Sequence, residues 1–359
     1  MNKSPQGLIL HDYFAMIGGG EKLVLTLADF LEWPVTAGFV ESGLLEQTDF
    51  VIALNSLHAY SGLAPLRILS LIQKWQRVRF NRLDNIIYSG VYAPLSVLNN
   101  QANNILYCHT PPRFVYDKRD YYLNTLPAWQ RYFFKYLINY FRHKYELAIK
   151  NMDIVVANSQ HIQKRIKTYL NADSQVIYPP CDTQHFQWQS QGDYYLSTAR
   201  LDGLKRVDVI VQAFMQMPDK KLIVASGGSE LDKLKHMAKD SKNIHFSNWI
   251  SQEKLYDLVN NCIASIYIPY DEDFGISPVE SMAAGKPVVG VNEGGLTETI
   301  IDQQTGYLLD TAKNLQPQLI ETINQLDLKQ ARNMKEACEI QAKRFSQEIF
   351  LEQMGALLL

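Results

Sequence analysis

The sequence has few cysteines, no long apolar run and almost no net charge. Its four cysteines, Cys108, Cys181, Cys262 and Cys338, stand far apart, without a C-x-x-C pair or a histidine cluster at metal-ligand spacing. Neither a disulfide framework nor a metal site is therefore indicated. No apolar stretch approaches the ~18–20 residues that span a bilayer, and the first residues show no signal peptide. We expect a protein of the reducing cytoplasm, neither secreted nor anchored by a transmembrane helix.

The net charge of −2 removes any general argument for nucleic-acid binding. This small net charge is the sum of two halves of opposite charge. Residues 1–183 carry 18 basic and 14 acidic side chains, hence +4, whereas the rest of the chain carries 17 basic and 23 acidic ones, hence −6. The two halves are therefore expected to face different partners.

The basic excess gathers in two places. One is a run without any acidic residue, made of Arg67, Lys74, Arg77, Arg79 and Arg82. The other, residues 113–150, holds eight Lys or Arg, three acids and twelve aromatic residues. This mixture suits peripheral contact with an anionic membrane, and it suits equally a helix pair with an aromatic core side and a solvated basic side. Both interpretations stay open at this stage.

A length of 359 residues exceeds the ~250–300 that one hydrophobic core usually holds, so two domains are expected. In both halves, short apolar runs alternate with amphipathic helical patterns, which is typical of parallel α/β units. Pro179 and Pro180 interrupt this alternation. We predict one doubly wound domain over 1–183, a second over 184–340, and a C-terminal helix over 341–359 that packs back on the N-terminal domain.

The apolar and helical patterns also give ranges for individual elements. Strands are expected over 7–14, 50–55, 85–90, 103–110, 153–159, 194–200, 221–228, 243–249, 264–270 and 287–292. Helices are expected over 21–33, 206–217, 230–239, 253–262 and 276–285, and from about residue 312 onward only helices are expected.

The segment DEDFGISPVESMAAG, residues 271–285, is the most informative for chemistry. Gly275 permits a close backbone approach, and a helix is expected to begin near Ile276. Backbone N–H groups at such a helix start suit an anion such as a diphosphate. Glu272 and Glu280 stand eight residues apart, where they can accept hydrogen bonds from sugar or ribose hydroxyls. An acidic cluster that only satisfies the helix dipole is the structural alternative.

Two further segments place cations or glycines at strand ends. Arg200 ends an expected strand and Lys205 precedes the next helix, where the pair can bind a diphosphate and stabilise its charge as it leaves. A solvated basic loop would contain the same residues. Gly18, Gly19 and Gly20 separate the first strand from the first helix and let a ligand touch the backbone. Their spacing matches neither a dinucleotide fingerprint nor a P-loop.

One histidine, His109, directly follows an expected strand and precedes two prolines. A lone histidine is more often structural than catalytic. A position at the end of a parallel strand, followed by a loop that cannot become helix at once, favours a functional role here.

Taken together, these strings resemble the retaining glycosyltransferases of family four, which adopt the α/β GT-B fold of two Rossmann-like, doubly wound parallel-sheet domains facing a central cleft. The resemblance rests on an ordered series over nearly the whole chain: GGGEKLV, YCHTPPRFVYD, DIVVANSQHI, VIYPPCD, ARLDGLKRVD, and EDFGISPVESMAAGKPVVGVNEGGLTETI followed by TGYLL. Glu272 and Glu280 meet the E-x7-E pattern of that family. The HTPPR and KRVD forms look most like mannosyltransferases that build bacterial surface polysaccharides, including the O-antigens of lipopolysaccharide.

The resemblance implies roles for the candidates that would contact the donor nucleotide. Arg200 and Lys205 would bind its diphosphate, and Glu280 would bond its ribose. The Gly18–Gly20 segment would lie near the phosphates and the acceptor. Where relatives commonly carry a glycine before the segment that binds the nucleobase, this chain has Asn248 and Trp249. Their bulk would stack on the nucleobase or narrow its pocket.

The resemblance also implies roles at the donor sugar. Glu272 and the backbone of Phe274, Gly275 and Ile276 would hold its hydroxyls. His109 would contact the sugar and help to stabilise the transition state.

The resemblance therefore implies a retaining hexosyltransferase that moves mannose from GDP-mannose to a lipid-linked or polysaccharide acceptor, at the inner face of the cytoplasmic membrane. A UDP-sugar is the main rival donor. No metal or cofactor is expected, because the cations and the helix start would neutralise the diphosphate. A sugar epimerase or phosphorylase on a similar frame, and a non-catalytic nucleotide-sugar binding protein, remain as alternatives.

Overall fold

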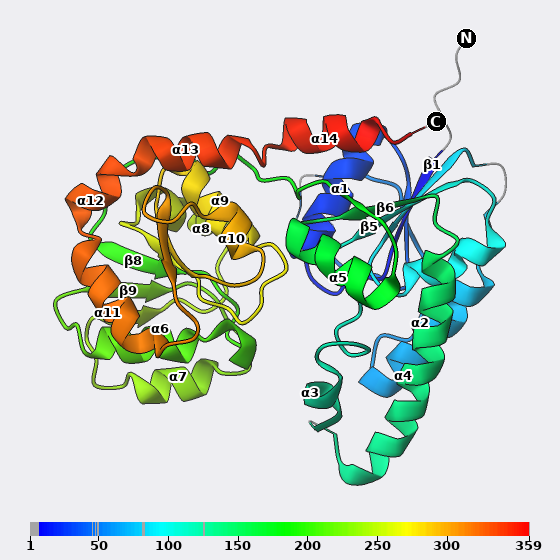
Figure 1. Cartoon of the computed structure of the whole chain (residues 1–359), viewed down its shortest axis with the longest axis horizontal. Helices are drawn as coiled ribbons and strands as arrows, with labels where there is room; N and C mark the ends of the chain where they lie inside the picture. Colours follow the sequence, from blue (N-terminus) through cyan, green and yellow to red (C-terminus); the bar gives the residue numbers. More distant parts are fainter. Residues whose placement is uncertain are drawn as a thin grey trace. The chain divides into compact units, whose positions relative to one another are not determined.

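The computed structural model describes residues 7–44, 46, 48, 50–80, 83–124 and 126–358. The chain divides into two compact units (Figure 1): Met1–Tyr178 with Leu351–Leu359, and Pro179–Phe350. The division falls before Pro179 rather than at the expected 183/184. The physical reason is that Cys181 N–H donates to Phe345 O at 2.8 Å and pairs with Ser346 in a β-bridge, both within the second unit.

The first unit is built on a seven-stranded parallel sheet with the order β3-β2-β1-β4-β5-β6-β7. Its strands are β1 (Gly7–His11), β2 (Val35–Ala37), β3 (Leu54–Ser56), β4 (Asn85–Ser89), β5 (Asn103–Cys108), β6 (Ile154–Ala157) and β7 (Gln175–Val176). Strands β1 and β4 are buried at every position, as expected for a parallel sheet covered on both faces. The strand order reverses between β1 and β4, which makes this point the switch point of the sheet.

The helices of the first unit pack on this sheet. They are α1 (Gly19–Leu31), α2 (Ala64–Arg77), the 3-10 segment η2 (Ala93–Asn99), α3 (Arg119–Asn124), α4 (Ala128–Ile149) and α5 (Gln160–Leu170). Trp75 from α2, together with Phe141 and Tyr145 from α4, joins Tyr88 of β4 in one buried cluster. Helix α4 extends well past the edge of the sheet, with α3 beside it (Figure 1).

The second unit repeats the design with a six-stranded parallel sheet in the order β10-β9-β8-β11-β12-β13. Its strands are β8 (Tyr194–Ser197), β9 (Lys221–Val224), β10 (Ile244–Phe246), β11 (Ser265–Ile266), β12 (Val288–Val291) and β13 (Gly306–Leu309). Its helical segments are η3 (Gly203–Lys205), α6 (Val207–Met215), α7 (Leu231–Met237), α8 (Gln252–Asn261), α9 (Ile276–Ala283), α10 (Leu296–Thr299), α11 (Leu315–Gln325), α12 (Leu328–Asn333) and α13 (Lys335–Lys343). Here the order reverses between β8 and β11.

The chain ends in helix α14 (Gln347–Gly355), and its last residues belong to the first unit from Leu351 onward. The Asn103 side chain at the start of β5 donates a hydrogen bond to Leu357 O at 3.0 Å. The expected terminal helix over 341–359 is not continuous: the range contains the end of α13, which stops at Lys343, and the separate helix α14.

The predicted class of two doubly wound parallel α/β domains is confirmed. The expected strand over 50–55 appears as β3, shifted toward its end, and β2, β7 and β13 lie outside every expected strand. Helices α2 and α5 lie outside every expected helix range. Gly19 and Gly20 form the start of α1 rather than a loop, because the Glu21 side chain accepts from Gly18 N–H and caps the helix. In the described part of the chain, no helix is both long and apolar enough to cross a membrane.

Candidate functional site

In the first unit, polar side chains meet at the carboxyl ends of β1, β4 and β5. His11 ends β1, Ser89 ends β4, and His109 directly follows β5. Ser89 Oγ lies 3.1 Å from His11 Nδ1 and 2.8 Å from His109 Nε2. One hydroxyl therefore connects two imidazole rings at the switch point of the sheet, the usual location of ligands in this kind of fold.

The glycine segment lies against this cluster. A Cβ atom added at Gly20 would lie 3.6 Å from His109 Cε1, so the start of α1 covers the histidine ring. Gly18 N–H donates to Glu21 Oε2 at 3.0 Å. The structure thus brings together two predictions made separately, His109 and the glycines.

Glu21 adds a carboxylate to the cluster. Its Oε1 lies 3.7 Å from His11 Nε2, which is an ion-pair distance. Burial raises the pKa of Glu21, but the interactions with His11 and with backbone N–H groups outweigh it and leave the pKa lowered. A charged Glu21 therefore favours a hydrogen on His11 Nε2.

Ser89 couples the tautomers of the two histidine rings. We assign the hydrogen of His11 to Nε2, facing Glu21, so that Nδ1 accepts from the Ser89 hydroxyl and Ser89 Oγ accepts from Nε2–H of His109. His109 then presents an unprotonated Nδ1. Burial of the ring, followed by the effect of His11, lowers the pKa of His109 to about 4, so the ring is neutral near pH 7. A neutral Nδ1 can accept a hydrogen bond from a substrate hydroxyl.

Asp12 holds the ends of β1 and β4 in register. Its carboxylate accepts from the backbone N–H groups of Val91, Tyr92 and Ala93 at 2.7, 2.6 and 2.8 Å. Burial raises the pKa of Asp12, although these three hydrogen bonds oppose the shift. The sequence shows no spacing that identifies Asp12, His11 or Ser89, and none was predicted.

In the second unit, the structure brings Lys205 and Glu272 together. Lys205 ends η3 after β8, and Glu272 lies in the loop after β11, so both are near the switch point. Lys205 Nζ lies 2.7 Å from Glu272 Oε2 and donates to Tyr267 OH at 3.0 Å. The two charged side chains are only 20% and 18% exposed. Burial and the nearby Glu272 raise the pKa of Tyr267, so the phenol stays protonated.

A second ion pair, which sequence reasoning missed, supports the same loops. Arg206 donates to Glu293 Oε1 at 2.9 Å and to Pro269 O at 3.3 Å. Glu293 Oε1 also accepts from Asp271 N–H at 3.2 Å. Arg206 lies within the KRVD string, but nothing in its spacing from Glu293 marks the pair. These contacts fix the loop after β11 against the loop after β12.

Two glycines after β12 allow the closest approach in this region. Gly295 N–H donates to Glu272 O at 2.7 Å, and a Cβ at Gly295 would lie 2.5 Å from Phe274 Cα. Gly294 has a φ of +62°, which glycine adopts without strain. The glycine pair therefore sets the path of the backbone around Glu272.

Helix α9 begins at Ile276, as predicted, with Gly275 as its N-cap at a φ of +85°. The N-cap glycine has no side chain with which to cap the first turn, and N–H groups at such a helix start suit an anion. Glu280 lies inside the helix and is partly exposed. Both Glu272 and Glu280 raise the pKa of Tyr267, after burial, so both carboxylates lie within electrostatic range of one phenol.

Arg200 and Trp249 are the most exposed of the predicted residues in this unit. The Arg200 side chain is 58% exposed and its Nε lies 3.9 Å from Asp202 Oδ2. Trp249 is 60% exposed and its indole packs over Gly227, where a Cβ would lie 2.5 Å from Nε1. Neither residue is tied to the Lys205 ion pair by the contacts of the described chain.

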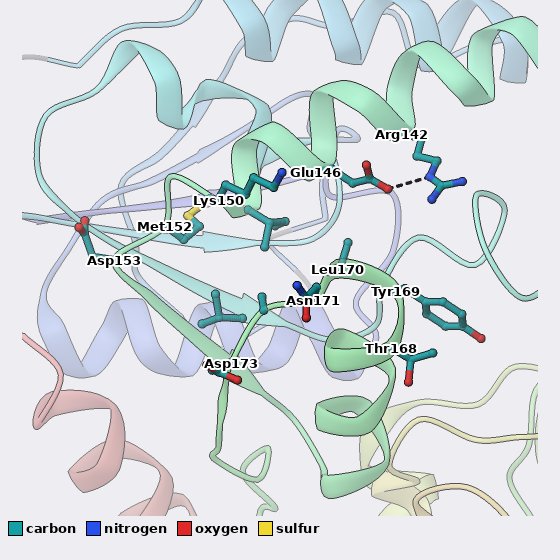
Figure 2. Close-up of a pocket in the computed structure, with 13 residues that line it drawn as sticks. Arg142, Glu146, Lys150, Met152, Asp153, Thr168, Tyr169, Leu170, Asn171 and Asp173 are labelled. Carbon is teal, nitrogen blue, oxygen red and sulfur yellow. Dashed lines mark hydrogen bonds and ion pairs between the residues drawn. The ribbon is translucent and has the colours of Figure 1, made fainter.

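A separate pocket lies on the first unit, between the end of α4 and α5 (Figure 2). Its volume is about 530 Å³, and Arg142, Glu146, Lys150 and Asp173 are among its lining residues. None of the predicted site residues lines it. Across residues 7–358, apart from the few positions that are not described, no group of three His, Cys, Asp or Glu side chains could hold a metal ion.

Comparisons with known proteins identify similar sequences. Residues 182–345 match the model of the family "Glycosyl transferases group 1". The alpha-1,3/1,6-mannosyltransferase ALG2 of Dictyostelium discoideum is 27% identical over 277 residues, which cover 63% of this chain and 63% of that protein. The human ALG2 is 26% identical over 298 residues, or 73% of this chain and 69% of that protein. The chain thus spans about two-thirds of the length of these relatives.

Solved structures show the same fold over nearly the whole chain. Sucrose-phosphate synthase from Thermosynechococcus elongatus gives a TM-score of 0.77 at 18% identity and covers 98% of both chains. Anabaena Alr3699/HepE, solved in complex with UDP-glucose, gives 0.73 at 17% identity and also covers 98% of both. These neighbours confirm the predicted GT-B fold. The family match covers residues 182–345, so the second unit contains a glycosyltransferase group 1 domain.

Proposed function

We propose that the protein transfers a mannosyl residue from a nucleotide-diphosphate donor to a glycan or lipid-linked acceptor. The observation that carries the proposal is the cluster of Lys205, Glu272 and Tyr267 at the switch point of the unit that matches the glycosyltransferase family. The similarity to ALG2 mannosyltransferases supports mannose as the sugar. GDP-mannose is the proposed donor, and a UDP-sugar is the alternative, since a structural neighbour was solved with UDP-glucose.

In this proposal, different residues bind different parts of the donor. The diphosphate binds Arg200, Lys205 and the N–H groups at the start of α9, while Glu280 accepts from the ribose. Lys205 leaves Glu272 for the phosphate, and Glu272 then accepts from a sugar hydroxyl. A cation that stabilises developing negative charge lowers the activation barrier most where water is largely excluded. The side chains of Lys205 and Glu272 are only 20% and 18% exposed.

The proposed reaction retains configuration by front-side attack. The bond between the anomeric carbon and the phosphate oxygen breaks, and a bond from that carbon to the acceptor oxygen forms on the same face. The acceptor proton passes to the leaving diphosphate, whose charge Arg200 and Lys205 stabilise. No side chain acts as a covalent nucleophile, and no metal or cofactor is part of the proposal, since the two cations can neutralise the diphosphate.

His109 is proposed to orient the donor sugar from the first unit. Its neutral ring, with hydrogen on Nε2 toward Ser89, can accept a sugar hydroxyl at Nδ1. The four cysteines are buried thiols. This suits a reducing compartment, and we propose a cytoplasmic location.

Thermal unfolding with a panel of GDP, UDP, GDP-mannose and UDP-glucose tests the donor proposal. A ligand at 100 times its dissociation constant adds ~2.7 kcal/mol to the stability of the folded state. We expect GDP-mannose to raise the melting temperature most, and Glu280→Gln to reduce that rise. No shift with any nucleotide would overturn the proposal, and a shift with UDP-glucose alone would replace GDP by UDP.

The transfer step needs a second measurement. Radiolabelled GDP-mannose is incubated with the protein and bacterial lipid and polysaccharide extracts, and label in both fractions is counted. We expect incorporation that Lys205→Ala abolishes and that the surface control Lys239→Gln leaves intact. Binding without incorporation into lipid or polysaccharide would support a non-catalytic binding protein.

A further inference from the structure

Helix α4 has two apolar faces, and only one of them is buried. The buried face carries Leu137, Ile138, Phe141 and Tyr145 into the core of the first unit. The other face carries the exposed aromatic residues Trp129, Tyr132, Phe133, Tyr136 and Tyr140. Trp129, Tyr132 and Tyr136 are 78%, 83% and 73% exposed, respectively. A surface helix normally shows polar residues on the side away from the core.

The exposed aromatic residues form a single stripe. Their spacing of three, four, seven and eleven residues from Trp129 places them on one side of an α-helix. We call this set, Trp129, Tyr132, Phe133, Tyr136 and Tyr140, the aromatic stripe. Contiguous exposed apolar groups on this scale mark interaction sites rather than ordinary surface.

Helix α2 extends the apolar surface beside the stripe. A groove of about 540 Å³ is lined by Leu66, Leu69 and Arg77 from α2 and by Tyr140 from α4. Tyr140 OH donates to Gln76 Oε1 at 3.3 Å, which joins the two helices. Both helices lie at the same end of the first unit (Figure 1).

The charge of this surface has one sign. Next to the stripe on α4, Lys135 is exposed and Lys144 Nζ lies 5.8 Å from the ring centroid of Tyr140. The one acid of α4, Glu146, is paired with Arg142 at 2.7 Å. Helix α2 carries Arg67, Lys74 and Arg77 and no acid. Arg79 follows α2, whereas Arg82, the last residue of the basic run, lies outside the described residues. The partner of this surface must therefore be anionic.

The combination identifies the occupant. A second copy of the chain docked through the same face would bring two basic surfaces together, which like-charge repulsion opposes. A bilayer with anionic lipids offers what the surface lacks: phosphate groups for the Lys and Arg side chains, and an apolar layer just below them. Trp and Tyr prefer that boundary, because each has an apolar ring and a polar tip.

We infer that the aromatic stripe of α4, with the basic residues of α2 and α4, docks the protein on an anionic bilayer surface. The rings enter the boundary between headgroups and acyl chains, and the basic side chains contact lipid phosphates. This binding is peripheral and goes beyond the proposed function, because it involves no residue of the donor site.

Co-sedimentation of the full chain with vesicles tests the inference. Vesicles of phosphatidylcholine alone are compared with vesicles that also contain phosphatidylglycerol. We expect the protein to pellet with the anionic vesicles only, and less at high salt. The variant Lys74→Gln/Lys135→Gln should bind roughly 25-fold more weakly, at roughly fivefold per cation near the surface. Its matched control, Lys239→Gln/Lys242→Gln, changes two exposed lysines of the second unit and should bind like the unmodified protein.

The aromatic contribution is tested by Trp129→Ser/Tyr132→Ser/Tyr136→Ser, with Ile340→Ser, an exposed apolar residue of α13, as control. We expect the triple variant to lose binding and the control to keep it. Should the triple variant fail to fold, tryptophan fluorescence gives a second test. Brominated lipids should quench part of the emission of the unmodified protein, and this quenched part should be missing in Trp129→Phe. Equal binding by the variants and their controls would overturn the inference. A dimer of the unmodified protein that the triple variant abolishes would assign the stripe to a second copy and overturn it as well.

Discussion

Replacing Lys205 with alanine separates two contributions of the same ammonium group. In the structure, Lys205 Nζ neutralises Glu272 at 2.7 Å, and in the proposed reaction it stabilises the leaving diphosphate. A charge-assisted hydrogen bond contributes ~1.5–3 kcal/mol when it is shielded from water. Since the two side chains are 20% and 18% exposed, solvent screening reduces this value. We expect the free energy of unfolding to fall by about 1–2 kcal/mol.

The loss of turnover should be larger than the loss of stability. Removing one group that stabilises a developing anion lowers kcat by a factor on the order of 10²–10³. Release of GDP from GDP-mannose, in the presence of a lipid extract as acceptor, measures kcat, and urea denaturation measures stability.

The double variant Lys205→Ala/Glu272→Gln provides the control. It removes the carboxylate that Lys205→Ala leaves without its cation, so we expect stability to recover in part while turnover stays low. Recovered turnover would show that Lys205 acts only by compensating Glu272. Normal kcat in Lys205→Ala, with merely weaker donor affinity, would refute the proposed stabilisation of the leaving group.

Three further predictions concern the same sites. Ser89→Ala should turn the single tautomer of His109 into a mixture, visible in the ¹⁵N chemical shifts of the ring, while an unchanged spectrum would disprove the hydrogen-bond chain. Acid should destabilise the protein between about pH 6.5 and 4, because unfolded His109 takes up a proton below its usual pKa of ~6.5 and the native ring only near 4. The free energy of unfolding should fall by at most about 1.4 kcal/mol per pH unit, and His109→Gln should reduce this pH dependence, as measured by urea denaturation. Gly295→Ala should cost about 1–3 kcal/mol and weaken nucleotide binding in calorimetry, because the new Cβ would meet Phe274 Cα at 2.5 Å; wild-type affinity would show that the loop can shift freely.

The repeating pattern of apolar runs and helices was sufficient to predict both doubly wound domains. The strands that escaped were short: β2 has three residues, β7 two and β13 four, too few for a pattern to stand out. The start of α1 was placed too late because glycine is a poor helix former, whereas the Glu21 cap compensates for it.

At the site, the sequence identified individual residues but not their partners. Lys205 and Glu272 were both predicted, yet their ion pair spans 67 positions and exists because β8 and β11 are neighbours in the sheet. Ser89 was missed altogether, since a single serine 78 positions from His11 carries no local signal. Side chains that are brought together only by the order of strands in the sheet have no characteristic spacing in the sequence, so the sequence does not reveal that they are partners.

The ion pair between Lys205 and Glu272 also bears on which ligands the protein selects. Each of the two groups already has an acceptable partner, so an incoming molecule has to satisfy both charges at once to displace them. A bare phosphate offers Lys205 a new partner but leaves Glu272 with none. Under the proposed function, a nucleotide that carries its sugar supplies both an anion for Lys205 and a hydroxyl for Glu272. The ion pair therefore favours binding of the complete donor over binding of a bare phosphate.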